Sequence, residues 1–274
     1  MGPRDRSPDT GSLVFFEHVN LRVPDHRLAT LYFIEGLGLT RDPLRMVGTR
    51  NMWVNAGLQQ FHLPIGEPTP LPGEVGVVVP DLEAVLAQLD AVSRELKGTA
   101  FSVERADGTL RTTTPWGHRI RIHARAALPG WVPQALAYVE FWVAPGTAAG
   151  IGAFYQTVLG CPVEACAIDG DAAVSVTVGP GQTFRFRERP GAGIVPNANH
   201  VAVYLTRYRS IYAEIEARGL VMEADADEQF RFQDIVDPGS GVRIYRFEHE
   251  MRSLYHRGYR RPLVNRVPVP WEVD

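Results

Sequence analysis

The sequence predicts an α+β protein made of four successive units, each with the order strand–helix–strand–strand–strand. The first observation is an alternation of apolar and polar residues over 15–23, followed at once by an apolar run of helical spacing that ends near residue 36. This succession is the pattern of a half-buried strand that leads into an amphipathic helix. The second observation is that it recurs from residues 74, 138 and 200, at a period of roughly 60 residues. Short β-like runs and turn residues follow each helix and complete the units.

The first unit contains clear start and stop signals. Pro24 ends the first expected strand, because proline cannot donate a hydrogen bond to a neighbouring strand. Asp25 can cap the helix that follows, and Gly36 ends that helix. The last strand of the unit places Gln60 and His62 on one face.

The later units close in the same way. The second unit begins with a strand at Glu74 and ends with the alternating strand 119–123. The closing strands of the third and fourth units are expected at 182–187 and 242–247. A run rich in proline and glycine around residues 126–134 separates the two halves of the chain.

These boundaries predict two domains of two units each. Residues 1–12 are expected to be a disordered tail. The N-terminal domain covers 13–126 and the C-terminal domain covers 134–250. Residues 251–274 are basic and aromatic without a clear period, and we expect an arm across the body or across a partner subunit, which suggests a homodimer.

Composition excludes several classes of function. The chain has 274 residues and a formal net charge of −3, so nothing indicates a nucleic-acid partner. No apolar run approaches the ~20 residues that cross a bilayer, and no signal-peptide core is present. We therefore expect no membrane partner and a cytoplasmic location. Cys161 and Cys166 are interpreted as small core residues instead of a disulfide.

Several stretches resemble the βαβββ modules of the vicinal oxygen chelate superfamily, which includes glyoxalase I, extradiol dioxygenases and bleomycin-resistance proteins. The residues that carry the resemblance are 18–25 with 36–39 in the first unit, 154–160 in the third and 237–241 in the fourth. The resemblance covers about Leu13 to Glu250, and four modules resemble the two-domain dioxygenases. It implies two domains, each a cup that holds a divalent metal by the first and last strands of its two modules.

In the N-terminal pair of modules, the resemblance implies that His18, His62 and Glu74 are metal ligands. Two imidazoles and a carboxylate suit Fe²⁺, Mn²⁺, Zn²⁺ or Ni²⁺. Arg121 stands where the family often has a glutamate, and we assign it a catalytic role in orienting an anionic substrate, because a guanidinium cannot ligate a metal. Substrate contacts are expected from Asn20 and Gln60.

The C-terminal pair departs from the dioxygenase pattern. Its corresponding positions are Tyr138, Arg185, His200 and Tyr245. Because Glu140 shares a face with Tyr138, a looser site with Glu140 and Tyr245 as catalytic residues is one interpretation. Substrate contacts are expected from Tyr138, Trp142, Arg185, His200 and Tyr204. The alternative is structural: hydrogen-bonded core histidines, arginines with buried stems, and aromatic residues that only pack.

Two functions remain open from the sequence. The first is a divalent-metal-dependent lyase, isomerase or extradiol-type dioxygenase that acts on a small oxygen-rich or aromatic substrate. The second is a metal-free protein that sequesters a small molecule, similar to the drug-resistance members of the superfamily. A mixed case has one working cup and one degenerate cup.

Overall fold

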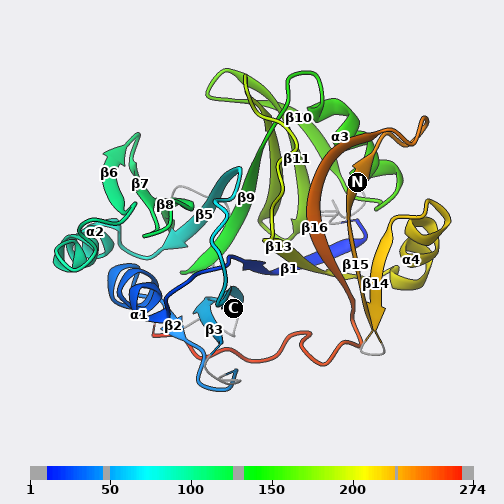
Figure 1. The fold of residues 1–274 in the computed structure, drawn as a ribbon. Helices are drawn as coiled ribbons and strands as arrows, with labels where there is room; N and C mark the ends of the chain where they lie inside the picture. The colour runs from blue at the N-terminus through cyan, green and yellow to red at the C-terminus, as the bar shows by residue number, and fades with distance from the viewer. Residues whose placement is uncertain (1–10, 46–49, 126–132, 226–227, 267–274) are drawn as a thin grey trace, which may run out of the picture.

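The computed structural model describes residues 11–45, 50–125, 133–225 and 228–266. They form two curved sheets of eight strands each, with the helices on the outside (Figure 1). Four βαβββ modules build the sheets, so the predicted α+β class and the four modules are confirmed. No helix in these ranges is both long and apolar enough to cross a membrane.

The modules follow the chain in order. The first contains β1 (Leu13–Asn20), α1 (His26–Ala29), the π-helix η1 (Thr30–Gly36), β2 (Thr40–Arg41), β3 (Asn51–Ala56) and β4 (Gln59–Pro64). The second contains β5 (Gly73–Val79), α2 (Leu82–Val92), β6 (Ser102–Ala106), β7 (Thr109–Thr113) and β8 (Arg119–Ala124). The third contains β9 (Ala135–Val143), α3 (Ala148–Thr157), β10 (Val163–Ile168), β11 (Asp171–Gly179) and β12 (Gln182–Glu188). The fourth contains β13 (His200–Leu205), α4 (Tyr208–Ala217), β14 (Val221–Asp225), β15 (Gln229–Val236) and β16 (Arg243–Ser253).

The modules do not pair as the sequence predicted. One sheet has the order β14-β15-β16-β13-β1-β4-β3-β2 and joins modules one and four. The other has the order β10-β11-β12-β9-β5-β8-β7-β6 and joins modules two and three. We call the polar faces of these sheets the 1–4 cup and the 2–3 cup. Each cup is therefore built from both halves of the chain, and the predicted pairing of neighbouring modules is wrong.

Modules one and two pack through their helices instead of their strands. A Cβ atom added to Gly36 of η1 would lie 2.8 Å from Leu89 of α2, so the two helices approach closely at this glycine. The first strands remain available, and β1 pairs with β13 while β5 pairs with β9, both antiparallel. Helix contact thus joins modules one and two without placing their strands in one sheet.

The apolar faces of both sheets form one continuous core. Phe16 of β1 meets Phe184 of β12 with ring centroids 5.3 Å apart, and Phe141 of β9 meets Phe247 of β16 at 4.7 Å. Both contacts link one sheet to the other. Burial of these rings leaves the polar positions of the alternating strands on the opposite faces, where they line the cups.

The predicted termini need two corrections. Ser12 is buried, and its backbone N–H donates to the Gly160 carbonyl at 3.1 Å, so residue 12 is not part of a loose tail. Strand β16 continues to Ser253, so the arm begins later than predicted. Residues 254–266 then run across to module one (Figure 1). The rest of the predicted tail and arm, 1–10 and 267–274, lies outside the described residues.

Candidate metal centre

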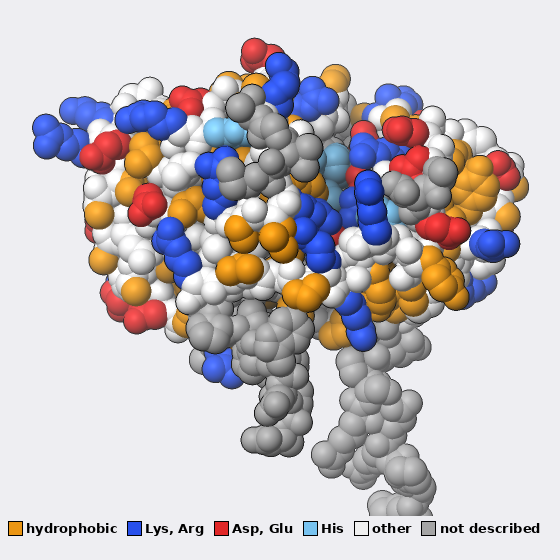
Figure 2. Space-filling model, turned by 90° about the horizontal axis from the view of Figure 1, so that it is seen from below, with side chains coloured by type: hydrophobic (Ala, Val, Ile, Leu, Met, Phe, Trp, Pro, Cys, Tyr) orange, Lys and Arg blue, Asp and Glu red, His pale blue; other side chains and the backbone are white. Residues whose placement is uncertain are grey.

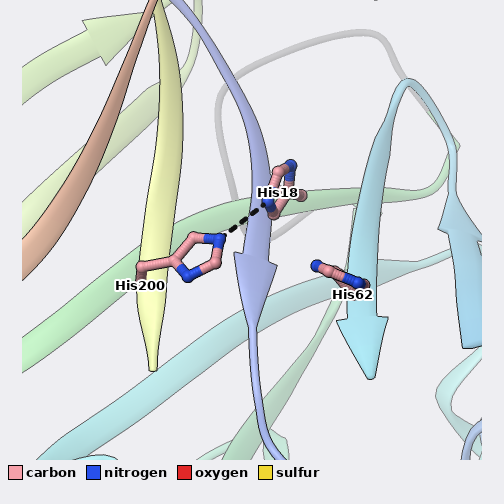
Figure 3. Close-up of side chains that lie close together, drawn as sticks. All are labelled: His18, His62 and His200. Carbon is pink, nitrogen blue, oxygen red and sulfur yellow. Dashed lines mark hydrogen bonds between the residues drawn. The ribbon is translucent and has the colours of Figure 1, made fainter. Parts of the chain in front are cut away.

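Three histidines meet on the adjacent strands β13, β1 and β4 (Figure 3). The ligand atoms of His18, His62 and His200 all lie within 4.8 Å of one another. The Nε2 atoms of His18 and His200 are 3.3 Å apart. Two nitrogens bound at about 2.1 Å to one tetrahedral ion would be roughly 3.4 Å apart, so this spacing suits a shared metal.

The strand register brings these side chains together. Asn20 of β1 lies opposite His200 on one side and His62 on the other. A β-bulge between Phe16 and His18 adjusts the face on which His18 appears. Ala202, the partner of His18 in β13, carries only a methyl group and leaves space for the imidazole of His200.

Neighbouring polar groups orient two of the imidazoles. His18 Nδ1 lies 2.8 Å from Glu17 Oε2, so Nδ1–H donates to this carboxylate and Nε2 faces the cluster with its lone pair. His62 Nε2 lies 3.0 Å from the side-chain oxygen Oδ1 of Asn51, and the side-chain amide nitrogen of Asn20 lies 2.9 Å from His62 Nδ1. These contacts place the lone pair of His62 on Nδ1, where the Asn20 amide would give way to a metal.

Glu250 adds a carboxylate to the cluster, and sequence reasoning missed it. Strand β16 runs parallel to β13 and pairs Ala202 with Glu250. Glu250 Oε2 lies 3.4 Å from His200 Nε2, and the residue is buried. The sequence signal was weak, because Glu248, His249 and Glu250 are three polar residues in a row and interrupt the alternation just past the predicted end of the strand.

Tyr245 does not belong to this site, so its predicted catalytic role is wrong. The residue is buried on the opposite face of β16, with its ring against Phe141 and Phe186 in the core. Its hydroxyl has no hydrogen-bond partner in the described part of the chain. The prediction failed because the closing strand was ended too early, and the converging position therefore fell on the wrong residue.

Burial sets the charge of the cluster. Removal from water lowers the pKa of His18 and of His200 well below the ordinary value, and it lowers the pKa of His62 to about 3. All three are therefore neutral near pH 7. Burial alone would raise the pKa of Glu250, but Arg252, His18 and Arg231 together outweigh burial and the pKa is lowered. Three neutral imidazoles and a carboxylate are the donor set that a divalent ion of the first transition row takes.

A buried ion-pair chain supports two members of this set. The guanidinium of Arg252 contacts both Glu17 and Glu250. Glu17 also accepts a hydrogen bond from the Tyr204 hydroxyl at 3.0 Å. Arg252 thus connects the carboxylate that orients His18 to the carboxylate beside His200. Tyr204, which was predicted to contact substrate, here serves as a donor to Glu17.

Glu74 and Arg121 lie in the 2–3 cup, apart from the histidines. The Tyr138 hydroxyl donates to Glu74 Oε1 at 2.9 Å, and Arg121 Nε lies 2.9 Å from the same oxygen. His123 Nε2 lies 3.0 Å from the Tyr138 hydroxyl. The prediction that Glu74 ligates a metal with His18, and that Arg121 acts beside them, is corrected, because module two pairs with module three.

The remaining predicted residues divide between the two cups. Glu140 accepts a hydrogen bond from Trp142 Nε1 at 2.9 Å, and Arg185 lies over the Tyr138 ring at 3.8 Å, all in the 2–3 cup. The Tyr138 ring also fills the space above Gly76, where an added Cβ would lie 2.1 Å from it. The described residues of this cup contain no cluster of metal-ligating side chains.

Gln60 belongs to the 1–4 cup. Its amide donates to Asp42 at 2.8 Å and to Asn55 at 2.6 Å. These bonds occupy its donors in holding neighbouring chain segments. Figure 2 shows the molecule from below. Basic side chains lie near the centre of the view, and histidine atoms lie between them.

Comparison with known proteins supports the fold at low sequence identity. No protein-family model matches the sequence, and no curated protein is significantly similar to it. Glyoxalase I from Zea mays has a TM-score of 0.62 at 14% identity, over 86% of this chain and 91% of that chain. A Bacillus subtilis protein proposed to be a dioxygenase has a TM-score of 0.53 at 14% identity, over 93% of this chain and 92% of its own.

These likenesses and the module architecture agree. The chain has the vicinal oxygen chelate fold, in a form with four βαβββ modules and two cups. The polar residues distinguish the two cups. The 1–4 cup contains three histidines, and the 2–3 cup contains Tyr138 together with the ion pair between Arg121 and Glu74.

Proposed function

We propose that the 1–4 cup binds a divalent metal ion and is the active site of a lyase, isomerase or extradiol-type dioxygenase. The ligands would be His18, His62 and His200, with Glu250 as a fourth. The observation that carries this proposal is the convergence of three neutral imidazoles, two buried and one half-buried, from three adjacent strands. Without a metal, the Asn20 amide donates to His62 Nδ1 at 2.9 Å and the Nε2 atoms of His18 and His200 lie 3.3 Å apart. A bound metal would replace both contacts.

The donor set fits Fe²⁺, Mn²⁺, Zn²⁺ or Ni²⁺, and it does not choose among them. A bound ion would act as a Lewis acid toward two neighbouring oxygen atoms of a small oxygen-rich or aromatic substrate. The chain itself fixes the geometry. Glu17 holds the tautomer of His18, and Arg252 keeps Glu250 ionised. Trp53 stacks on His62 with ring centroids 3.9 Å apart, and the guanidinium carbon of Arg45 lies 4.2 Å from the centroid of the Trp53 ring.

The fold neighbours support the choice of reaction class. Glyoxalase I and the proposed dioxygenase share the fold of this chain, and the donor set of the 1–4 cup suits either chemistry. The substrate partner, the homodimer and the cytoplasmic location remain predictions from the sequence.

Metal analysis of the purified protein tests this proposal. We expect the native chain, after chelation and reconstitution with each of the four ions, to retain close to stoichiometric metal with at least one of them. His18→Ala and His62→Ala should each lose it. His26→Ala is the matched control, because His26 contacts the Leu63 carbonyl at 2.8 Å outside the cluster. A native chain that retains none of the ions contradicts the proposal.

The competing function is metal-free binding of a small molecule. It is favoured for the 2–3 cup, because the described residues of that cup contain no group of three or more side chains that could hold a metal. Thermal-shift screening with and without EDTA separates the two. A substrate of the 1–4 cup should stabilise the reconstituted protein and lose that effect in EDTA. Stabilisation that is equal in both conditions would support binding alone.

A further inference from the structure

The arginines of the 2–3 cup fall into two groups. Arg121 and Arg187 are paired: Arg121 lies 2.9 Å from Glu74, and Arg187 lies 2.7 Å from both Asp169 and Asp171. A second group has no carboxylate oxygen within 4.0 Å in the described part of the chain. It consists of Arg119, Arg185 and Arg189.

Two members of the second group lie on the same aromatic ring. The guanidinium carbons of Arg119 and Arg189 are 4.4 Å and 4.5 Å from the centroid of Trp142. Arg119 begins β8, Arg189 follows β12, and Trp142 lies on β9. The ring thus collects cations from both sides of its strand, and all three side chains keep some exposure to solvent.

Stacking holds a guanidinium by its face and leaves its N–H edge free. The two carbons can be no more than about 9 Å apart, because both lie near one centroid. The N–H groups extend outward from these carbons, so different oxygen atoms of one oxyanion can accept a hydrogen bond of about 2.8 Å from each arginine. Glu140, on the same strand as Trp142, is already held by other groups: the indole Nε1 donates to it at 2.9 Å, and Arg187 lies 3.8 Å away.

We propose that Arg119, Arg189 and Trp142 form a binding site for a small oxyanion, a phosphate or carboxylate group, at the rim of the 2–3 cup. Arg185, on the Tyr138 ring further along the same cup, favours a ligand with a second anionic group. A cation is excluded as the ligand, because Glu74, Asp169 and Asp171 are already held by arginines. This site is separate from the 1–4 cup and does not depend on its metal.

Isothermal titration with inorganic pyrophosphate tests the site directly. EDTA is present throughout, so that metal in the other cup cannot bind the probe, and sodium chloride matches the ionic strength. We expect the native chain to bind and the Arg119→Gln/Arg189→Gln double variant to lose about tenfold or more in affinity. The matched control is Arg105→Gln/Arg218→Gln, two arginines on helical and hairpin surfaces that are paired with Glu83 and Glu214.

Two further arms keep the result interpretable. Arg189→Lys retains the charge but loses the fork geometry, so its affinity should fall between those of the native chain and the double variant even if the glutamines impair folding. His18→Ala should bind pyrophosphate like the native chain, which separates this site from the metal proposal. No binding to the native chain, or equal binding by native chain and folded double variant, overturns the inference.

Discussion

Glu17 shows how much one side chain contributes to the candidate centre. Its carboxylate is buried and contacts His18, Arg252 and Tyr204, and Arg45 lies 3.6 Å away. A metal-bound imidazole commonly donates its second N–H to such a carboxylate, which fixes its tautomer and raises its basicity. Sequence reasoning read position 17 only as part of a strand, because a β-bulge cannot be seen in the alternation of residues.

We predict that Glu17→Gln weakens metal binding about 10- to 100-fold, because the amide cannot hold His18 as a carboxylate does. It should also lower thermal stability, since Arg252 loses one of its two carboxylates. Competition with a chromogenic chelator measures the affinity. Glu83→Gln, at an exposed ion pair, is the control. Unchanged affinity in the Glu17 variant would show that the contact is only structural.

His249 makes stability depend on pH. Its ring is buried and stacks on Phe232 at 4.6 Å, and burial lowers its pKa to about 4. In the unfolded chain the imidazole takes up a proton near pH 6.5. Protonation therefore stabilises the unfolded state relative to the folded state as the pH falls. Stability is therefore complete above pH 6.5 and is lost progressively down to pH 4, by about 3 kcal/mol from this residue.

We predict that His249→Phe loses less stability than the native chain between pH 7.5 and pH 5, by about 2 kcal/mol. Urea unfolding at the two pH values measures the difference. Other buried histidines, such as His118 with a pKa lowered by burial to about 4, contribute to the remaining slope in both proteins. Equal pH slopes would refute the assignment to His249.

Among the elements, β16 separates what the sequence could predict from what it could not. Alternation and helical spacing located the strands and helices of four modules, and they placed His18 and His62 on the correct faces. Strand β16 continues past Phe247, and the candidate ligand Glu250 was missed because the predicted strand ended too early. His200 was predicted to contact substrate and not to join His18 and His62, because module four was expected to pair with module three.

The sequence could not predict which modules pair to form a sheet. The first strands of all modules show similar patterns, and nothing local tells β1 whether it will meet β5 or β13. The choice rests on contacts between distant residues, such as Gly36 with Leu89 and Phe16 with Phe184. Glu74 was consequently placed with the histidines although it lies in the other cup.

At the scale of the whole molecule, each cup needs both halves of the chain. The arm reinforces this connection, because the side chain of Asn265 bonds to the backbone of Gly57 at 3.0 Å and 2.8 Å, and Arg261 reaches Asp42 at 2.7 Å. The arm therefore adds contacts between module four and module one beyond the pairing of β1 with β13.

We predict that residues 1–126 alone bind metal at least tenfold more weakly than the full chain, although they contain His18, His62 and Glu74. Without β13, the edge of β1 is unpaired and His200 and Glu250 are missing. Co-expression with residues 133–274 should restore both folding and metal binding. A soluble 1–126 fragment with full affinity would support the N-terminal domain that the sequence predicted.

Anomalous diffraction from crystals of the reconstituted protein tests the proposed position of the metal most directly. We predict a single anomalous peak in the 1–4 cup, with nitrogens of His18, His62 and His200 at about 2.1 Å and Glu250 completing the shell. A peak beside Glu74 in the 2–3 cup, or metal-loaded protein with no peak among the three imidazoles, would contradict the account.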